Sequence, residues 1–282
     1  MTILVTGARG KVGRAVIDLL HAAGHTVRAA SADPAQLTVP AGVEVAELAL
    51  DRPGTFAAAL RGVRQVFLYP QPAGIHELVE AAEAAGVEHV VLLSSSSVLG
   101  PAAANDPLAS HSLLVEQALA GSALTCTLLR PDAFASNSLG WAWFIGNSTP
   151  VQLAYPDAHI APIHPEDIAD IAVAALTGDS LTGRAVTLTG AESLTFREQL
   201  AVLAYTLGRE IEVEHITRAE AEQQMGRHMP APMVSSLLDL WQAADRHGPA
   251  VIADTTETLL GRPARSYRQW ARENAAAFTT AR

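Results

Sequence analysis

The sequence predicts an α/β fold of the Rossmann type: a doubly wound parallel sheet with a smaller, mainly helical lobe at the C-terminal end. Short apolar runs typical of strands alternate with helix-like runs through residue 130, which is the pattern of a parallel sheet covered by helices on both faces. The region 191–282 reads mainly as helices instead. A chain of 282 residues, 49% of them apolar, can bury the core of one large domain with a small appendage.

The predicted elements follow in regular order, and Gly24, Gly62, Gly86 and Gly121 stand where helices should end. We expect the strands at residues 2–6, 25–30, 43–48, 63–69, 88–94 and 124–129. We expect helices at residues 12–23, 53–61, 73–85, 110–120, 195–207, 218–225, 233–246 and 263–278.

A glycine-rich turn opens the first helix, because Gly7, Gly10 and Gly13 follow the apolar run 2–6 and enter the amphipathic run 12–23. Glycines permit a tight turn and let backbone amides approach a pyrophosphate, whose charge the dipole of the following helix favours. The pattern predicts a dinucleotide-binding turn, although its first gap is one residue longer than in G-x-G-x-x-G. A plain connecting loop is the alternative. The expected contacts come from Gly7, Arg9, Gly10, Lys11, Val12 and Gly13.

We expect one compact unit over residues 1–282, because no repeat or low-complexity linker divides it. Residues 1–130 are its predicted dinucleotide-binding core, and residues 131–190 a mixed extension that completes the sheet and the pocket. Residues 191–282 are the predicted substrate lobe. Ligands of open parallel sheets bind beyond the carboxyl ends of the strands, so a lobe placed there closes over the cofactor.

Composition excludes several classes of function. The formal charge of −10, with no basic run longer than two residues, argues against a nucleic-acid or anionic-membrane surface, so we expect a small-molecule ligand. Cys126, in the apolar run 124–129, is interpreted as a buried small hydrophobe. Without a disulfide framework, a leader or a membrane span, the predicted location is cytoplasmic. The ten histidines show no zinc-like spacing, so no metal is expected. The oligomeric state stays open.

The start Thr6–Gly13 resembles the T-G-x-x-G-x-x-G of the NmrA-like branch of the atypical short-chain dehydrogenases/reductases. Typical members of that superfamily use the tyrosine of a Y-x-x-x-K pair as general acid. Such a pair cannot exist here, because Lys11 is the only lysine. The residues four positions after Tyr69, Tyr155, Tyr205 and Tyr267 are Ala73, His159, Arg209 and Ala271. The chemistry therefore uses another acid, or none.

The end of the second strand favours NADP(H) over NAD(H). An NAD-preferring site usually has Asp or Glu there to bind the ribose 2′-hydroxyl, and this chain has Ala29–Ser31. Arg9 is the best candidate for a 2′-phosphate, because guanidinium suits bidentate phosphate binding, and Ser31 can donate a hydrogen bond. Asp33, before Pro34, is interpreted as a helix cap, with a ribose contact as the alternative.

The resemblance implies further cofactor contacts. Family members place an acidic residue after the third strand beside the adenine, which Asp51 matches, with a helix cap as the alternative. The turn after the fourth strand normally borders the cofactor, which places Tyr69 near the nicotinamide ribose as a wall. Arg130, before Pro131, resembles the L-R-P after which the family's loop approaches the nicotinamide. Ser94 is expected at the same edge.

Ser94–Ser97 ends the fifth strand, where related reductases place a serine that binds the substrate carbonyl. Aligning Val98–Gly100 with the family's V-Y-G puts Ser95 there, with Ser96 as second candidate. A hydroxyl at this point donates to an oxygen whose negative charge grows as hydride arrives; a polar strand end satisfied by the backbone is the alternative. His111, where the family's catalytic helix begins, is the nearest titratable substitute for the missing acid, or a solvent-facing histidine.

An aromatic-rich loop follows the sixth strand and is predicted to stack on a planar substrate, with core packing as the alternative. His164, before Pro165, is interpreted as a helix cap. The candidate pocket residues are Tyr69, Phe134, Asn137, Trp141 and Trp143.

These features predict an NADPH-dependent reductase of a ketone, quinone or other conjugated carbonyl, acting by direct hydride transfer, with an aromatic or conjugated carbonyl compound as substrate. NmrA-like proteins include members that bind the dinucleotide without turnover, so a redox sensor is the alternative function. An isomerase or cyclase on the same fold is a third possibility. The choice between quinone and ketone stays open.

Overall fold

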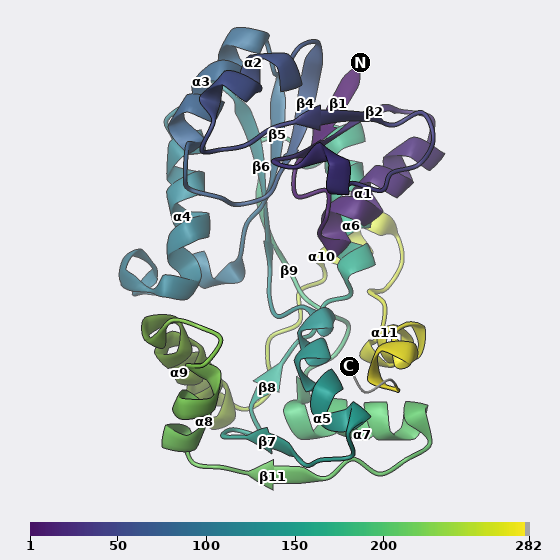
Figure 1. Ribbon diagram of the computed structural model, residues 1–282, viewed down its shortest axis with the longest axis vertical. Coiled ribbons are helices and arrows are strands. Elements are labelled where there is room, and N and C mark those ends of the chain that lie inside the picture. The colour runs from purple at the N-terminus through teal and green to yellow at the C-terminus, as the bar shows by residue number, and fades with distance from the viewer. Residues whose placement is uncertain (280–282) are drawn as a thin grey trace.

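The computed structural model describes residues 1–279, and its centre is a seven-stranded parallel sheet (Figure 1). The strand order is β3-β2-β1-β4-β5-β6-β9, which confirms the predicted doubly wound α/β class. The order reverses between β1 and β4, so the crevice typical of dinucleotide-binding sheets falls beyond the carboxyl ends of these two strands. The strands are β1 (Thr2–Val5), β2 (Thr26–Ser31), β3 (Glu44–Glu47), β4 (Val63–Leu68), β5 (His89–Leu93), β6 (Thr125–Pro131) and β9 (Ala185–Leu188).

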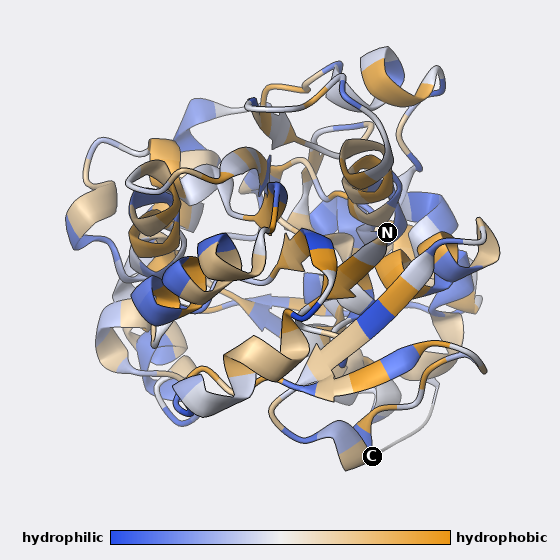
Figure 2. Cartoon of the chain, turned by 90° about the horizontal axis from the view of Figure 1, so that it is seen from above, coloured by the Kyte–Doolittle hydropathy of each residue, from blue (hydrophilic) through white to orange (hydrophobic). Residues whose placement is uncertain are grey.

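Helices cover both faces of this sheet. One face carries α1 (Lys11–Ala22) and α6 (Pro165–Thr177), and the other carries α2 (Phe56–Ala59), α3 (Ile75–Ala85) and α4 (Pro107–Ala120) (Figure 1). In Figure 2 the helices carry both hydrophobic and hydrophilic residues, as expected of helices with one face on a core. No helix within residues 1–279 combines the length and the apolar character needed to cross a membrane.

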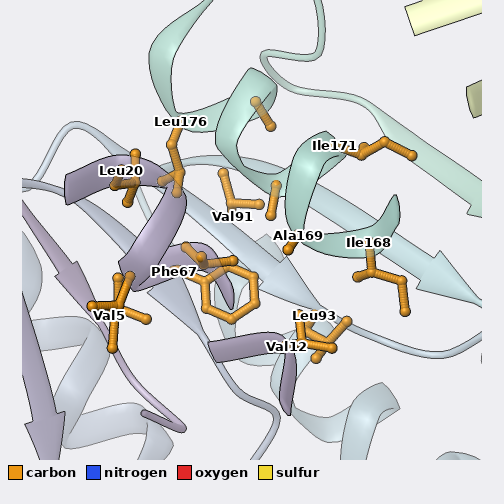
Figure 3. Packing of buried hydrophobic residues seen from close by; sticks show 14 of the residues in the cluster. Val5, Val12, Leu20, Phe67, Val91, Leu93, Ile168, Ala169, Ile171 and Leu176 are labelled. Carbon is orange, nitrogen blue, oxygen red and sulfur yellow. The ribbon is translucent and has the colours of Figure 1, made fainter. Parts of the chain in front are cut away.

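The sheet separates two apolar cores because successive side chains of a strand point to opposite faces. In β1, Ile3 and Val5 belong to the core under α1 and α6, whereas Leu4 belongs to the core under α2, α3 and α4. Phe67 of β4 lies centrally in the first core in the view of Figure 3, and Leu93 of β5 belongs to the same core. These packed strands hold the turn after β1 in place.

A second region lies beyond the carboxyl ends of the strands, at the bottom of Figure 1. This lower region has a core of its own, the lower core, which contains the aromatic residues Phe196, Tyr267 and Trp270. The helices are α5 (Ala142–Gly146), α7 (Phe196–Leu207), α8 (Arg218–Met225), α9 (Ala231–His247) and α11 (Tyr267–Glu273). The strands form two ladders, β8 (His159–Ile160) with β10 (Leu194–Thr195) and β7 (Val151–Leu153) with β11 (Val213–His215). Strands of two or three residues are too short to show a periodicity in the sequence.

The two regions are joined by more than the chain crossing between them. Helix α9 contacts α4, and α10 (Thr255–Leu260) packs against α6. The Thr255 hydroxyl donates to the carbonyl of Thr187 in β9 at 2.8 Å. Part of the region after residue 191 therefore returns to the sheet.

Two predicted helices differ from the structure. The helix expected at 53–61 begins as a 3₁₀ turn, Pro53–Thr55, and continues as the short α2. The helix expected at 263–278 is α11 followed by the 3₁₀ turn Ala275–Phe278. Ser266 explains the later start, because its side chain accepts a hydrogen bond from the backbone N–H of Gln269 and so caps α11.

Candidate functional site

The turn between β1 and α1 is built from backbone atoms. Gly7 has a φ of +63°, and its carbonyl accepts from the N–H of Gly10 at 2.8 Å. A Cβ on Gly13 would lie 2.4 Å from the Gly7 carbonyl oxygen, so only glycine lets α1 begin this close to the turn. Gly10, the residue before α1, provides no side-chain cap, which leaves the first N–H groups of the helix available to an anion. This cradle fits a dinucleotide pyrophosphate.

Tyr69 lies directly against this turn. Its backbone N–H donates to the Thr6 hydroxyl at 2.7 Å, and that hydroxyl donates to the carbonyl of Phe67 at 3.1 Å. A Cβ on Gly7 would come within 2.9 Å of the Tyr69 Cβ, yet 53% of Tyr69 is exposed. The ring is therefore an accessible wall beside the glycine turn.

Four residues form a hydrogen-bonded chain at the end of β2. The Arg9 guanidinium donates to Gln36 Oε1 at 2.9 Å, and Gln36 Nε2 donates to the Asp33 carboxylate at 2.6 Å. The N–H of Asp33 donates to the Ser31 hydroxyl at 3.1 Å. Arg9 and Ser31, the residues predicted to meet a 2′-phosphate, thus lie in one network.

Asp33 corrects part of the sequence interpretation. It stands at the N-cap position of the 3₁₀ turn Pro34–Gln36, as predicted, but its side chain caps no backbone N–H. The carboxylate accepts from the Gln36 side chain instead. Sequence reasoning missed Gln36, for which the sequence holds no specific signal. Asp51, beyond β3, is exposed, and its Oδ1 lies 3.8 Å from Arg52 Nε. Its predicted adenine contact stays a prediction.

Ser94 and Arg130 are linked through a buried carboxylate. The Ser94 hydroxyl donates to Glu116 of α4, and Arg130 donates from Nε and Nη2 to the two Glu116 oxygens at 3.0 and 2.6 Å. The hydrogen bond to Glu116 raises the pKa of Arg130 above its ordinary value. These contacts turn both predicted cofactor groups toward Glu116, which joins α4 to the ends of β5 and β6. Cofactor contact by either residue stays a prediction.

The serines after β5 differ in their partners. Ser95 Oγ accepts from the N–H of Ser97 at 3.2 Å and lies 2.8 Å from its hydroxyl, so it caps the 3₁₀ turn Ser96–Leu99. This is the backbone-satisfying alternative that the sequence left open. Ser96 Oγ donates to Asp132 Oδ1 at 3.3 Å. The structure thus brings the second candidate serine to a carboxyl group.

Asp132 was not among the predicted site residues. It directly follows β6, and burial raises the pKa of its carboxyl above the ordinary value, while hydrogen bonds from Ala133, Ser96 and Ala161 act in the opposite direction. The signal in the sequence was a carboxylate at the end of a strand neighbouring the serine run. His111 lies exposed on α4, and no described hydrogen bond connects it to Ser95 or Ser96.

The predicted pocket residues are spread over two environments. Trp141 packs edge-on against Phe196, with ring centroids 5.9 Å apart, which matches the core-packing alternative. Phe134 lies against the core under α1 and α6 and pairs with Ile163 in an isolated bridge. Asn137 is exposed, as is Trp143, at 55%. A substrate contact by any of them stays a prediction.

His164 caps α6, as predicted. Its Nδ1 accepts from the N–H of Glu166 at 3.1 Å, and its Nε2 lies 2.8 Å from the Glu273 carboxylate of α11. Possible ligand atoms of these three side chains lie within 4.8 Å of one another. Both ring nitrogens are already engaged, and Arg265 Nε lies 3.3 Å from Glu166 Oε2. The cluster therefore links α6 to α11 through hydrogen bonds and an ion pair.

Comparison with known proteins agrees with this geometry. Residues 7–179 match the sequence profile of a family described as NAD(P)H-binding. The chain belongs to the NAD(P)H-binding family. It is 39% identical to a (4-alkanoyl-5-oxo-2,5-dihydrofuran-3-yl)methyl phosphate reductase of Streptomyces griseus over 98% of this chain and 99% of that one. It is 32% identical to an NAD(P)H azoreductase of Xenophilus azovorans over 99% of this chain and 100% of that one.

Solved structures share the fold of this family member. An NADPH-dependent quinone oxidoreductase of Escherichia coli, in complex with NADPH, has a TM-score of 0.81 at 22% identity, covering 97% of this chain and 99% of that one. An NmrA mutant has a TM-score of 0.74 at 19% identity, covering 96% and 94%. The predicted NAD(P)-binding family is confirmed by the family match, and the likeness to NmrA shows a shared fold. With reductases at 32–39% identity over nearly the whole chain, the protein is an NAD(P)H-dependent oxidoreductase, as predicted.

Proposed function

We propose that this chain is an NADPH-dependent reductase of conjugated carbonyl compounds, quinones and aromatic or unsaturated ketones among them, acting by direct hydride transfer. The observation that carries the proposal is the glycine turn walled by the exposed Tyr69, at the sheet edge where Ser95 and Ser96 also end their strand. Such an edge places a nucleotide and a carbonyl oxygen side by side.

The cofactor is bound by atoms of three kinds. Backbone N–H groups around Gly10 and the start of α1 hold the pyrophosphate. Arg9 and Ser31 hold the 2′-phosphate, because the network at the end of β2 gathers a guanidinium and a hydroxyl there. The further proposed contacts are Gly7, Lys11, Val12, Gly13, Asp51, Tyr69, Ser94 and Arg130.

Preference for NADPH rests on the balance between Arg9 and Asp33. The Arg9 guanidinium attracts the 2′-phosphate, and the Asp33 carboxylate, engaged by Gln36, limits that preference because two anions repel each other. We therefore propose a moderate preference for NADPH.

The proposed substrate class follows from the relatives and from the missing acid. The name of the Streptomyces griseus relative describes an oxo-dihydrofuran ring with an alkanoyl group, and that of the Xenophilus azovorans relative an azo compound. Both contain a multiple bond that can accept a hydride. Tyr69 and the exposed Trp143, together with Phe134 and Asn137, are the proposed pocket walls for a planar substrate of this kind. Trp141 packs within the lower core and is left out of them.

NAD(P)H supplies, when bound, a hydride from C4 of the nicotinamide. The protein's part is to position the acceptor and to stabilise the charge that develops on it. Ser95 and Ser96, at the end of β5, are the proposed hydrogen-bond donors to the substrate oxygen. Helix α9 contacts α4 and so holds the lower region against the seven-stranded sheet and its helices.

The experiment is incubation with NADPH deuterated at C4, on each face separately, against quinones, unsaturated ketones and aromatic ketones, with mass spectrometry of the products. Deuterium that reaches a product from one face only supports the proposal and identifies the substrate class. Equal transfer from both faces, or transfer that persists after the protein is heat-denatured, would contradict it.

A further inference from the structure

We propose that Ser96 and Asp132 form the proton-donating pair of this reductase, with Ser96 facing the substrate oxygen and Asp132 acting through Ser96. The inference rests on the proposed function and deepens it. It answers the question left by the sequence, which lacks the Tyr-x-x-x-Lys pair because Lys11 is the only lysine.

The position of the pair is the first argument. Ser96 follows β5 and Asp132 follows β6, two neighbouring strands whose registers run in parallel from His89 with Thr125 to Leu93 with Leu129. Their side chains meet at the carboxyl edge, where Ser96 Oγ and Asp132 Oδ1 lie 3.3 Å apart. This edge is where an open parallel sheet binds its ligand.

The surroundings of the carboxyl are the second argument. Its described hydrogen-bond donors are Ser96 and the backbone N–H groups of Ala133 and Ala161, all of them uncharged. The charged groups on the adjoining elements, Arg130 of β6 and Glu116 of α4, are paired with each other at 2.6 Å. Burial without a cationic partner favours the protonated form and raises the pKa of Asp132, which is the direction that a proton donor needs.

The other candidates lack one of these properties. Ser95 pairs with the Ser97 hydroxyl and not with a carboxyl group, and Ser94 donates to Glu116, which is paired with Arg130. Tyr267 is buried, and its hydroxyl donates to Ser138 at 2.7 Å in the lower core. Within residues 1–279, the Ser96–Asp132 contact joins a serine of this strand end to a carboxyl that has no cationic partner.

The proton transfer is balanced as follows. The substrate takes two electrons as a hydride from the bound NADPH of the proposed reaction, and one proton from Ser96. In the protonated form of Asp132 the carboxyl donates to Ser96 Oγ, and the Ser96 hydroxyl is free to donate to the substrate oxygen. As the Ser96 proton then moves to the substrate oxygen, the Asp132 proton moves to Ser96 Oγ, so the serine is unchanged. The carboxylate left on Asp132 then takes a proton from water. No further oxidant or reductant is needed.

The test compares two kinds of hydride acceptor in Asp132→Asn and Ser96→Ala. A ketone or quinone needs a hydride and a proton, whereas a cationic triphenylmethane dye is discharged by a hydride alone. We expect each variant to lose about 100-fold more in kcat/KM with the carbonyl than with the dye, as general acids contribute. Asp157→Asn, which removes an exposed carboxylate paired with Arg197, is the matched control and changes neither rate.

Two further readouts separate the pair from a structural role. Wild-type kcat for the carbonyl falls as pH rises through the raised pKa of Asp132, and Asp132→Asn abolishes that limb. Both variants, Asp132→Asn and Ser96→Ala, bind NADPH within twofold of the wild-type affinity, measured by quenching of protein fluorescence. Equal losses with carbonyl and dye, or an unchanged pH profile, overturn the inference. If stereospecific deuteride transfer fails in the wild type with every acceptor, the proposed function fails instead.

Discussion

The turn after β1 and the strand ends of β5 and β6 lie at the same edge of the sheet but are built from different atoms. The turn is backbone: Gly7, Gly10 and Gly13 make room, and its polar groups are N–H and carbonyl. The strand ends are side chains that pair with one another, as Ser96 does with Asp132. The glycine turn therefore depends on the absence of side-chain atoms, and the strand ends depend on single functional groups.

Gly13→Ala is the strongest test of the glycine turn as a cofactor site. The added Cβ would lie 2.4 Å from the Gly7 carbonyl oxygen and force the turn apart, so we expect NADPH affinity to fall at least 100-fold. Fluorescence titration measures it, with circular dichroism as a check on folding. Gly54→Ala is the control, because a Cβ there meets nothing within 4 Å. Normal binding by Gly13→Ala would show that the turn is not the pyrophosphate site.

Glu116→Ala is the corresponding test of the strand ends, where side chains pair with one another. It leaves the partly buried Arg130 without its bidentate partner, so we expect a loss of about 3 kcal/mol in the free energy of unfolding. Urea denaturation measures it. Glu88→Ala removes an exposed partner of Arg64 and should cost under about 1 kcal/mol. Equal effects of the two substitutions would mean that Glu116 does not join α4 to the strand ends.

Substitutions of Arg9 and Asp33 test what side chains near the glycine turn contribute to dinucleotide affinity. Arg9→Ala should weaken NADPH binding about 10-fold, because it removes one charge-assisted contact, and it should leave NADH binding unchanged. Asp33→Asn should shift the ratio of the two affinities toward NADPH, because it removes a carboxylate near the 2′-phosphate position. Isothermal titration with both dinucleotides measures the ratio. Parallel losses for NADPH and NADH would remove Arg9 from the 2′-phosphate site.

The smallest expected effect lies at the opposite, amino-terminal edge of the sheet. His89 is buried there beside the Thr127 hydroxyl, at 2.9 Å, and burial lowers its pKa, with Asp179 acting in the opposite direction. Below the ordinary histidine pKa of about 6.5 the unfolded chain takes a proton that the folded chain refuses. Stability is therefore full above that pH and declines as the pH falls. His89→Gln should reduce the difference in urea midpoint between pH 7.5 and 5.5; an unchanged difference would assign it to other groups.

The sequence predicted the fold class and the glycine turn because both are local. Strands of five to seven mainly apolar residues and helices ended by glycine can be recognised within one window, and the glycines at 7, 10 and 13 mark the turn between the first strand and the first helix. Tyr69 lies beside that turn because the strand order brings the ends of β1 and β4 together, and its predicted contact with the cofactor stays a prediction.

The tertiary structure decided which polar side chains meet. Ser96 and Asp132 are 36 residues apart, Arg9 and Gln36 are 27 apart, and Trp141 packs on Phe196 in the lower core. No periodicity encodes such pairs, because a hydrogen bond between side chains depends on strand register and rotamer, which the packing of the whole sheet sets. The sequence by itself determined the glycine turn at which a dinucleotide is predicted to bind, and only the folded chain showed which groups stand beside it.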